Sequence, residues 1–222
     1  MAAHYGKEYF TWQAPMGEFG GWANAPIFSE YISNDDIVLD FGCGGGYLLN
    51  NLTCRHRIGV DINPEALKVA AGKGIDTYQD VRSVPSESID VIITNHALEH
   101  TLNPFREISE LFRALKPHGR IVCVVPCETI HTAYRPDDPN HHLFSWGPLT
   151  LGNLFTEAGF TVLESKPHFH QWPPFYRWFV RLGGRTFFDF ASRVYSRIDR
   201  RNYQIRLVGE KPASSVEWRT HS

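Results

Sequence analysis

The stretch VLDFGCGGGYLLNNL, residues 38–52, runs from an apolar segment into a cluster of glycines and then into leucines at helical spacing. Glycines have no side chain, so the chain can turn sharply there and a ligand can lie against bare backbone near the start of a helix. Asp40 lies just before the first glycine, Gly42, and a second carboxylate, Asp61, follows further along the chain. The stretch therefore predicts a ligand-binding turn at the end of a strand, between two carboxylates.

From this strand onward, short apolar runs alternate with helical patterns. The clearest helix is predicted over residues 104–116, with Asn103 and Pro104 at its N-cap and first position. A second helix is expected over residues 148–158, and the last strand over 203–208. This alternation is typical of βαβ units and a parallel sheet, which binds ligands beyond the carboxyl ends of its strands.

The composition is that of an ordinary globular protein, with 222 residues, 42% hydrophobic, and a formal net charge of −2. Such a charge gives no overall attraction to nucleic acid or acidic lipid. The start of the chain, MAAHYGKEYFTW, lacks the pattern of a signal peptide, so we expect an intracellular, cytoplasmic protein. The four cysteines show no paired spacing, and we expect buried thiols and no metal site.

Two features decide which ligand fits the glycine turn. A dinucleotide motif starting at Gly42 would need glycine at position 47, where Tyr47 stands, which disfavours an NAD-dependent dehydrogenase. Asp40 would repel a pyrophosphate but attract an ammonium or a sulfonium. Asp61, at the end of the second strand, can accept the hydroxyl protons of a ribose. The ligand therefore needs a ribose and a cationic end, as S-adenosylmethionine has.

Five motifs follow one another in unbroken order between residues 36 and 126: VLDFGCGGG, GVDINPEAL, YQDV, IDVIITNHALEH and LFRALKPHGRIVCVVP. In this order the chain resembles the class I S-adenosylmethionine-dependent methyltransferases, in the small-molecule type 11 group that includes the ubiquinone-biosynthesis O-methyltransferases. The resemblance implies an α/β fold with a Rossmann-like, seven-stranded, mostly parallel sheet. Helices would cover both faces, and the last strand would be antiparallel.

The resemblance also implies which residues bind S-adenosylmethionine. The glycines would line its methionine part, Asp40 would hold its ammonium, and Asp61 would bind its ribose. Asp80 would accept from the adenine amino group, and Asn95 would close the floor beneath the sulfonium. The full set of expected cofactor-binding residues is Asp40, Phe41, Gly42, Cys43, Gly44, Gly46, Asp61, Ile62, Asp80, Val81 and Asn95.

Methyl transfer is an in-line displacement, and a base is needed only if the acceptor arrives protonated. His100 in NHALEH and His142 in DDPNHHLFSW are the candidate catalytic residues. Either can instead shape the pocket or tie down a loop, and a metal-assisted O-methyltransferase is a further alternative. We expect transfer to an oxygen of a small acceptor that is sugar-like, quinone-like or lipid-linked. N-methylation of a small amine and a non-catalytic cofactor-binding protein are the other readings.

The chain is expected to divide into a helical lid segment (1–35), a methyltransferase domain (36–210) and a flexible tail (211–222). Aromatic residues in the lid would shield the sulfonium or simply pack in the outer helix layer. These are Tyr5, Tyr9, Phe10 and Trp12.

Within the domain, a helical insertion at about residues 168–200 combines aromatic with basic residues, and Gly183 and Gly184 break its helical pattern. Segment 170–198 would therefore lie on a membrane surface, cover a bulky or lipid-linked acceptor, or form a homodimer contact. No nucleic-acid partner is expected, because no nucleic-acid module accompanies these basic residues.

Overall fold

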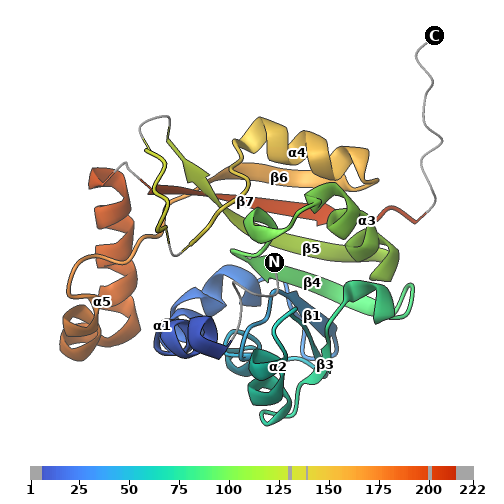
Figure 1. The fold of residues 1–222 in the computed structure, drawn as a ribbon, viewed down its shortest axis with the longest axis horizontal. Coiled ribbons are helices and arrows are strands. Elements are labelled where there is room, and N and C mark those ends of the chain that lie inside the picture. Colours follow the sequence, from blue (N-terminus) through green and yellow to red (C-terminus); the bar gives the residue numbers. More distant parts are fainter. Residues whose placement is uncertain (1–6, 130–131, 139, 200–201, 214–222) are drawn as a thin grey trace.

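The computed structural model describes residues 7–129, 132–138, 140–199 and 202–213. Within these residues the strands form one seven-stranded sheet in the order β3-β2-β1-β4-β5-β7-β6 (Figure 1). The strands are β1 (Ile37–Phe41), β2 (His56–Val60), β3 (Asp76–Tyr78), β4 (Ile89–Asn95), β5 (Leu115–Glu128), β6 (Thr161–His168) and β7 (Asn202–Glu210). The α-helices are α1 (Lys7–Ser29), α2 (Pro64–Ala71), α3 (Pro104–Ala114), α4 (Pro148–Glu157) and α5 (Tyr176–Ile198). Short 3-10 helices are η1 (Leu49–Asn51), η2 (Val81–Ser83) and η3 (Leu98–His100).

Strands β1 to β5 pair with one another in parallel. Strand β7 lies between β5 and β6 and is antiparallel to both. Because β6 is antiparallel to β7, it runs in the same direction as the first five strands. The predicted fold, a mostly parallel α/β sheet with an antiparallel last strand, is confirmed. The carboxyl ends of β1 to β6 therefore meet at one edge of the sheet, where a ligand can bind among the connecting loops.

Helices cover both faces of the sheet. Leu39 and Ile121 belong to a buried cluster with side chains of α3 and α4. Their neighbours Val38 and Val122 belong to a second cluster with side chains of α1 and α2. Successive side chains of a strand point to opposite faces, so both faces of this sheet are buried, as is usual for parallel sheets.

Helix α3 begins where the sequence predicts and ends earlier. The side chain of Asn103 caps it by accepting a backbone N–H of the first turn. The prediction of a helix over residues 104–116 is wrong at its end, because α3 stops at Ala114. Leu115 already pairs with Ile89 of β4 and starts the long strand β5.

The leucines after the glycine cluster form less helix than their spacing predicts. Only the 3-10 turn Leu49–Asn51 is present, and Leu52 is already extended. Leu49 and Leu52 are buried, so the apolar spacing reflects packing onto the core. The chain must also start β2 at His56, which leaves no length for a longer helix.

Helices α1 and α5 belong to the two segments that the sequence predicts to be helical outside the core of the domain. Helix α1 lies within the segment 1–35, and α5 within the expected insertion, broken at Gly183 and Gly184 as the sequence predicts. The division into a lid, a domain and a tail stays a prediction, and residues 214–222 of the tail lie outside the described residues. Among the described helices, none combines the length and apolar character needed to span a bilayer.

Candidate functional site

Asp40 is a buried carboxylate in β1, one residue before the strand ends. It is 2% exposed and forms no hydrogen bond with another described residue. Burial, and to a smaller extent the nearby Asp61, raise its pKa to about 8. A buried carboxylate without a partner is stabilised by a cation. Asp40 therefore forms an electrostatic site for an ammonium or a sulfonium.

The glycine turn after β1 leaves backbone open beside this carboxylate. Gly44 has a φ of 51°, and no heavy atom lies within 4 Å of the position its Cβ would take. Gly42 has a φ of 80°, and its Cβ would lie 2.3 Å from the Cβ of Ala97. Other residues rarely adopt such φ values. Gly44 thus leaves room for a ligand, and Gly42 lets the loop after β4 approach the turn.

Asp61 follows β2 and is fixed by two backbone groups. The N–H of Gly44 donates to Oδ2 and the N–H of Asn63 donates to Oδ1, each over 2.8 Å. Burial raises the pKa of Asp61, and these two hydrogen bonds oppose that effect. Each oxygen keeps a further lone pair that can accept a hydroxyl proton. Ile62, which is 50% exposed, offers an apolar surface for a flat ring beside it.

Four other expected cofactor residues pack into the core. Cys43 and Val81 are buried, and the side chain of Phe41 packs against the core cluster of α3 and α4. A Cβ at Gly46 would lie 2.4 Å from Cδ1 of Ile75, so this glycine allows close packing inside the protein. Where these residues border the glycine turn or η2, only their backbone is available to a ligand.

The last two expected cofactor residues lie at the same edge of the sheet. Asp80 caps η2 by accepting the N–H of Arg82, and its carboxylate also binds the guanidinium of Arg82. The Arg82 side chain holds the pKa of Asp80 at about 2. Asn95 is the partly buried last residue of β4. The contact between Asp80 and an adenine stays a prediction, because Arg82 already occupies that carboxylate.

A cluster of histidines and carboxylates follows β4 and β5. Glu99 is fully buried, and neither of its carboxylate oxygens forms a hydrogen bond. Its Oε1 lies 3.2 Å from Nδ1 of His96 and 4.0 Å from Nε2 of His100. A buried carboxylate at this position stabilises positive charge on either imidazole.

The structure brings the two candidate catalytic histidines together. The rings of His100, in η3, and His142, in the loop between β5 and α4, have centroids 5.0 Å apart. Nδ1 of His142 lies 2.7 Å from Oε1 of Glu128, the last residue of β5. His142 is thus oriented by a carboxylate through its Nδ1.

His100 is suited to accepting a proton. Burial lowers its pKa below the ordinary value, Glu99 opposes this, and the charges of His142 and His96 lower the pKa further. A backbone hydrogen bond at His141 acts in the opposite direction. The imidazole of His100 is therefore neutral near pH 7 and can act as a base.

Helix α1 approaches the glycine turn from the other side. The side chain of Phe10 reaches Gly45, with Cζ 3.3 Å from the position of a Cβ there. Phe10 therefore lies against the turn, and the lid role stays a prediction. Tyr5 and the side chains of Tyr9 and Trp12 lie outside the described residues.

Sequence reasoning did not identify Glu128 as part of the site. Its partner His142 is 14 residues away, and the two meet only because β5 extends to Glu128 and the following loop folds back. No local spacing pattern indicates such a pair. The approach of Ala97 to Gly42 is likewise a product of the sheet, since β1 and β4 are adjacent strands.

The two carboxylates at the turn fit a cationic ligand with a ribose better than a dinucleotide. Asp40 has no hydrogen-bond partner among the described residues, and each oxygen of Asp61 keeps a lone pair. A pyrophosphate at Gly44 would be repelled by Asp61 and by the ionised form of Asp40. The histidine cluster can also hold a cation. Ligand atoms of Glu99, His100 and His142 all lie within 4.8 Å of one another, a donor set that suits a divalent transition metal.

Comparison with known proteins gives one matching family. Residues 23–165 match the family described as a methyltransferase domain. A methyltransferase of Schizosaccharomyces pombe is 34% identical over 104 residues, covering 41% of this chain and 40% of that protein. The ubiquinone biosynthesis O-methyltransferase of Hahella chejuensis is 33% identical over 92 residues, covering 36% and 39%. The tRNA (carboxymethyluridine(34)-5-O)-methyltransferase of Arabidopsis thaliana is 32% identical over 114 residues, covering 48% and 28%.

Solved structures share the fold over nearly the whole chain. The methyltransferase bound to the Trm112 activator from Haloferax volcanii has a TM-score of 0.69 at 19% identity, covering 95% of this chain and 99% of that one. An S-adenosylmethionine-dependent methyltransferase from Archaeoglobus fulgidus has a TM-score of 0.63 at 20% identity, covering 91% and 99%. The chain spans less than half of the length of each of the three curated relatives.

Proposed function

The chain belongs to the class I S-adenosylmethionine-dependent methyltransferases, and from this premise we propose that it methylates an oxygen atom of a small acceptor that is sugar-like, quinone-like or lipid-linked. When bound, S-adenosylmethionine supplies an electrophilic methyl group. The protein contributes alignment, exclusion of water and removal of the acceptor proton.

The observation that carries the cofactor part of this proposal is Asp40, a buried carboxylate without a hydrogen-bond partner among the described residues, beside the open backbone of Gly44. Asp40 would bind the cationic amino-acid end of the cofactor. Asp61 would accept the ribose hydroxyls through its remaining lone pairs. The exposed Ile62 would pack on the adenine. These three roles together require a nucleoside with a positively charged end.

His100 would accept the acceptor proton. His100 follows Ala97 by three residues, and Ala97 meets Gly42, which supports a base near the turn that would hold the methyl donor. Glu99 would stabilise the imidazolium that forms, and His142 would contact the acceptor while Glu128 fixes its ring. An amine acceptor with a free lone pair would need no such base.

Cofactor class is tested by calorimetry with S-adenosylhomocysteine and with NAD. We expect binding of S-adenosylhomocysteine and none of NAD. Asp61→Ala should weaken binding by about 1–3 kcal/mol, because ribose hydroxyls lose their acceptor. Asp35→Ala, at an exposed position before β1, is the matched control and should bind normally. Preferential binding of NAD, or unchanged affinity of Asp61→Ala, would contradict this assignment.

Enzymatic turnover needs a separate test, because a protein can keep the cofactor site and lose catalysis. Incubation with methyl-labelled S-adenosylmethionine and a cell extract should transfer label to a small molecule. Cofactor binding without any transfer would favour the non-catalytic alternative.

Metal-assisted transfer is a second route, favoured by the ligand atoms of Glu99, His100 and His142 within 4.8 Å of one another. In that route a divalent cation would polarise the acceptor oxygen. Dialysis against a chelator separates the routes: a His100 base keeps its rate after metal removal, whereas a metal centre loses activity and regains it with added cation.

A further inference from the structure

Helix α5 carries a row of exposed apolar residues on the side that faces away from the sheet. In its second half, Phe190, Val194 and Ile198 recur at one-turn spacing and are 63%, 41% and 74% exposed. In its first half, Trp178 and Leu182 repeat this spacing and are each 58% exposed. Gly183 and Gly184 break the helix between these halves, so the outer face of α5, as we call these five residues, consists of two short apolar rows, one on each half. A large apolar row of this kind on a surface indicates a binding site.

The outer face is separate from the packing face of the same helix. Phe188, Ser192 and Ser196 are buried, and each precedes a residue of the outer face by two positions. Two helical positions correspond to about 200° of rotation, so the two rows lie on opposite sides. Phe188 packs on Phe19 and Trp22 of α1. The inner side of α5 therefore packs on α1, whereas the residues of the outer side are exposed to solvent.

Four exposed arginines flank the outer face in a repeated arrangement. Each directly precedes one of its apolar residues, in the pairs Arg177-Trp178, Arg181-Leu182, Arg193-Val194 and Arg197-Ile198. In the described part of the chain none of the four forms an ion pair with a carboxylate. Positive charge thus runs along the apolar row in both halves of the helix.

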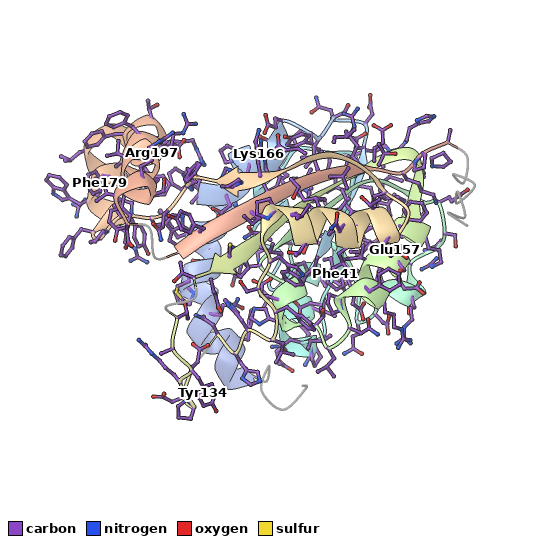
Figure 2. The ribbon with its side chains drawn as sticks, turned by 90° about the horizontal axis from the view of Figure 1, so that it is seen from above. Phe41, Tyr134, Glu157, Lys166, Phe179 and Arg197 are labelled. Atoms are coloured by element: carbon purple, nitrogen blue, oxygen red, sulfur yellow. The ribbon has the colours of Figure 1, made fainter. Side chains whose placement is uncertain are left out.

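The two acidic residues of α5 and its C-terminus contact partners outside the outer face. Asp189 lies 3.4 Å from the ring of His170, and Asp199 accepts a hydrogen bond from the hydroxyl of Tyr195. Among the described residues of α5 and its C-terminus, both carboxylates thus have partners of their own, and the outer face carries apolar and cationic side chains. Figure 2 shows α5, which carries Phe179 and Arg197, standing beside the body of the protein. The guanidinium of Arg197 lies 5.7 Å from the centre of the Phe169 ring.

From this charge pattern we propose that the outer face of α5 docks on an anionic lipid surface. Apolar side chains would enter the interface between headgroups and acyl chains, and the arginines would bind lipid phosphates. A second copy of this chain fits the pattern less well, because a twofold contact would bring the arginine rows against each other without a carboxylate between them. An acceptor lid would use the inner side, which α1 occupies.

The test is sedimentation of the full chain, without cofactor, with vesicles of phosphatidylcholine alone and of phosphatidylcholine mixed equally with phosphatidylglycerol. We expect binding at least about tenfold stronger to the anionic vesicles, reduced by about 0.5 M salt because ions screen the arginines. The paired change Trp178→Ser with Phe190→Ser should lose binding to both kinds of vesicle. Arg177→Gln with Arg181→Gln should lose the preference for anionic lipid.

Matched controls are Leu149→Ser on α4, where Leu149 is 75% exposed, and Arg135→Gln in an exposed loop. Both should bind vesicles as the unaltered protein does. All variants change exposed residues, so their thermal unfolding should stay close to that of the unaltered protein, and this is measured alongside. Equal binding to neutral and anionic vesicles overturns the proposal. So does a concentration-dependent mass that the Trp178 and Phe190 changes abolish, because it would show that a second copy covers the face.

Discussion

At the scale of single residues, Asp40 makes the stability of the protein depend on pH. Its pKa is about 8, whereas the ordinary value is 3.8. Between these values the folded protein keeps a proton that the unfolded chain has lost. The free energy of unfolding therefore falls as pH rises through this window, and the Asp40 contribution is greatest at its acidic end.

Asp40→Asn should remove this dependence, because the amide is a neutral group of nearly the same shape. Between pH 5 and pH 8 the variant should lose less stability than the unaltered protein, by at least about 1 kcal/mol. Urea denaturation without cofactor at several pH values measures the difference. Asp80→Asn is the control: the pKa of Asp80 is about 2, so its titration lies outside this range. Equal slopes for Asp40→Asn and the unaltered protein would contradict the assignment.

His100 should set the acidic limit of the reaction. Its pKa is lowered, chiefly by burial, so kcat/KM should fall only below about pH 6.5, the ordinary histidine value. His100→Ala should lower the rate by about 10²–10⁴-fold and abolish the fall of kcat/KM at acidic pH. His142→Gln removes a positive charge that lowers the pKa of His100, so kcat/KM should begin to fall at a higher pH in this variant. A nearly full rate in His100→Ala at every pH would leave His100 a purely structural role.

The carboxylates beside the glycine turn are easier to predict from the sequence than the histidine cluster. Asp40 and Asp61 can be found from the sequence because short, rigid strand ends place them beside a glycine turn. His100 and His142 can be named from their chemistry, but their meeting depends on two loops. Glu128 could not be found, because its contact with His142 depends on how the loop after β5 folds back.

At the scale of elements, Asn63 links helix α2 to the site. Its side chain caps α2 by accepting the N–H groups of Glu65 and Ala66, and its own N–H holds Asp61. Asn63→Ala should cost about 0.5–2 kcal/mol of stability through the lost cap. It should also weaken cofactor binding slightly, because the first turn of α2 positions the N–H that orients Asp61.

Asn103→Ala is the matched control, since Asn103 caps α3 in the same way and does not contact Asp61. Urea denaturation should show a similar loss of stability for both variants, and calorimetry should show weaker cofactor binding only for Asn63→Ala. Equal effects of both variants on binding would show that general loosening, and not the Asp61 contact, is responsible.

Element boundaries depend on more than local pattern. The capping residues Asn63 and Asn103 fix the helix starts and are visible in the sequence. The end of α3 is not, because Leu115 has the right spacing for the helix but pairs with Ile89 in the sheet. Strand pairing across the molecule therefore overrides the local helical pattern there.

At the scale of the whole molecule, α5 should be separable from the sheet. It connects β6 to β7, which are antiparallel neighbours with His168 opposite Gln204. Replacing residues 170–201 by a short glycine-containing turn should therefore leave the sheet folded. The variant also carries Phe19→Gln and Trp22→Gln, because removal of α5 would expose these two side chains.

Cofactor affinity of this variant should stay within about threefold of that of the unaltered protein, since the hydrogen bonds that fix Asp61 come from Gly44 and Asn63 and not from the replaced residues. Calorimetry with S-adenosylhomocysteine measures it, and circular dichroism checks the fold. A folded variant without cofactor binding would mean that α5 supports the cofactor site directly.

The overall fold follows from the order of strand and helix patterns, because a parallel sheet with short connections allows few arrangements. The direction in which α5 faces does not follow, because both of its sides are rich in aromatic residues. Phe188 and Phe190 look alike in the sequence, yet one is fully buried and the other largely exposed. Only the packing of α5 on α1 separates them.

Helix α1 touches the glycine turn and α5 through neighbouring residues. A Cβ at Gly21 would lie 2.5 Å from the backbone of Tyr47, and one at Gly20 would lie 3.2 Å from the ring of Trp172, in the segment leading to α5. The carbonyl of Trp22 accepts a hydrogen bond from Arg185 of α5 over 2.6 Å. If entry of the cofactor displaces α1 at the turn, the same displacement would disturb the contacts of α1 with Trp172 and Arg185. In that case cofactor binding and surface binding by α5 would be coupled, and thermodynamic reciprocity would require each to change the affinity of the other by the same factor.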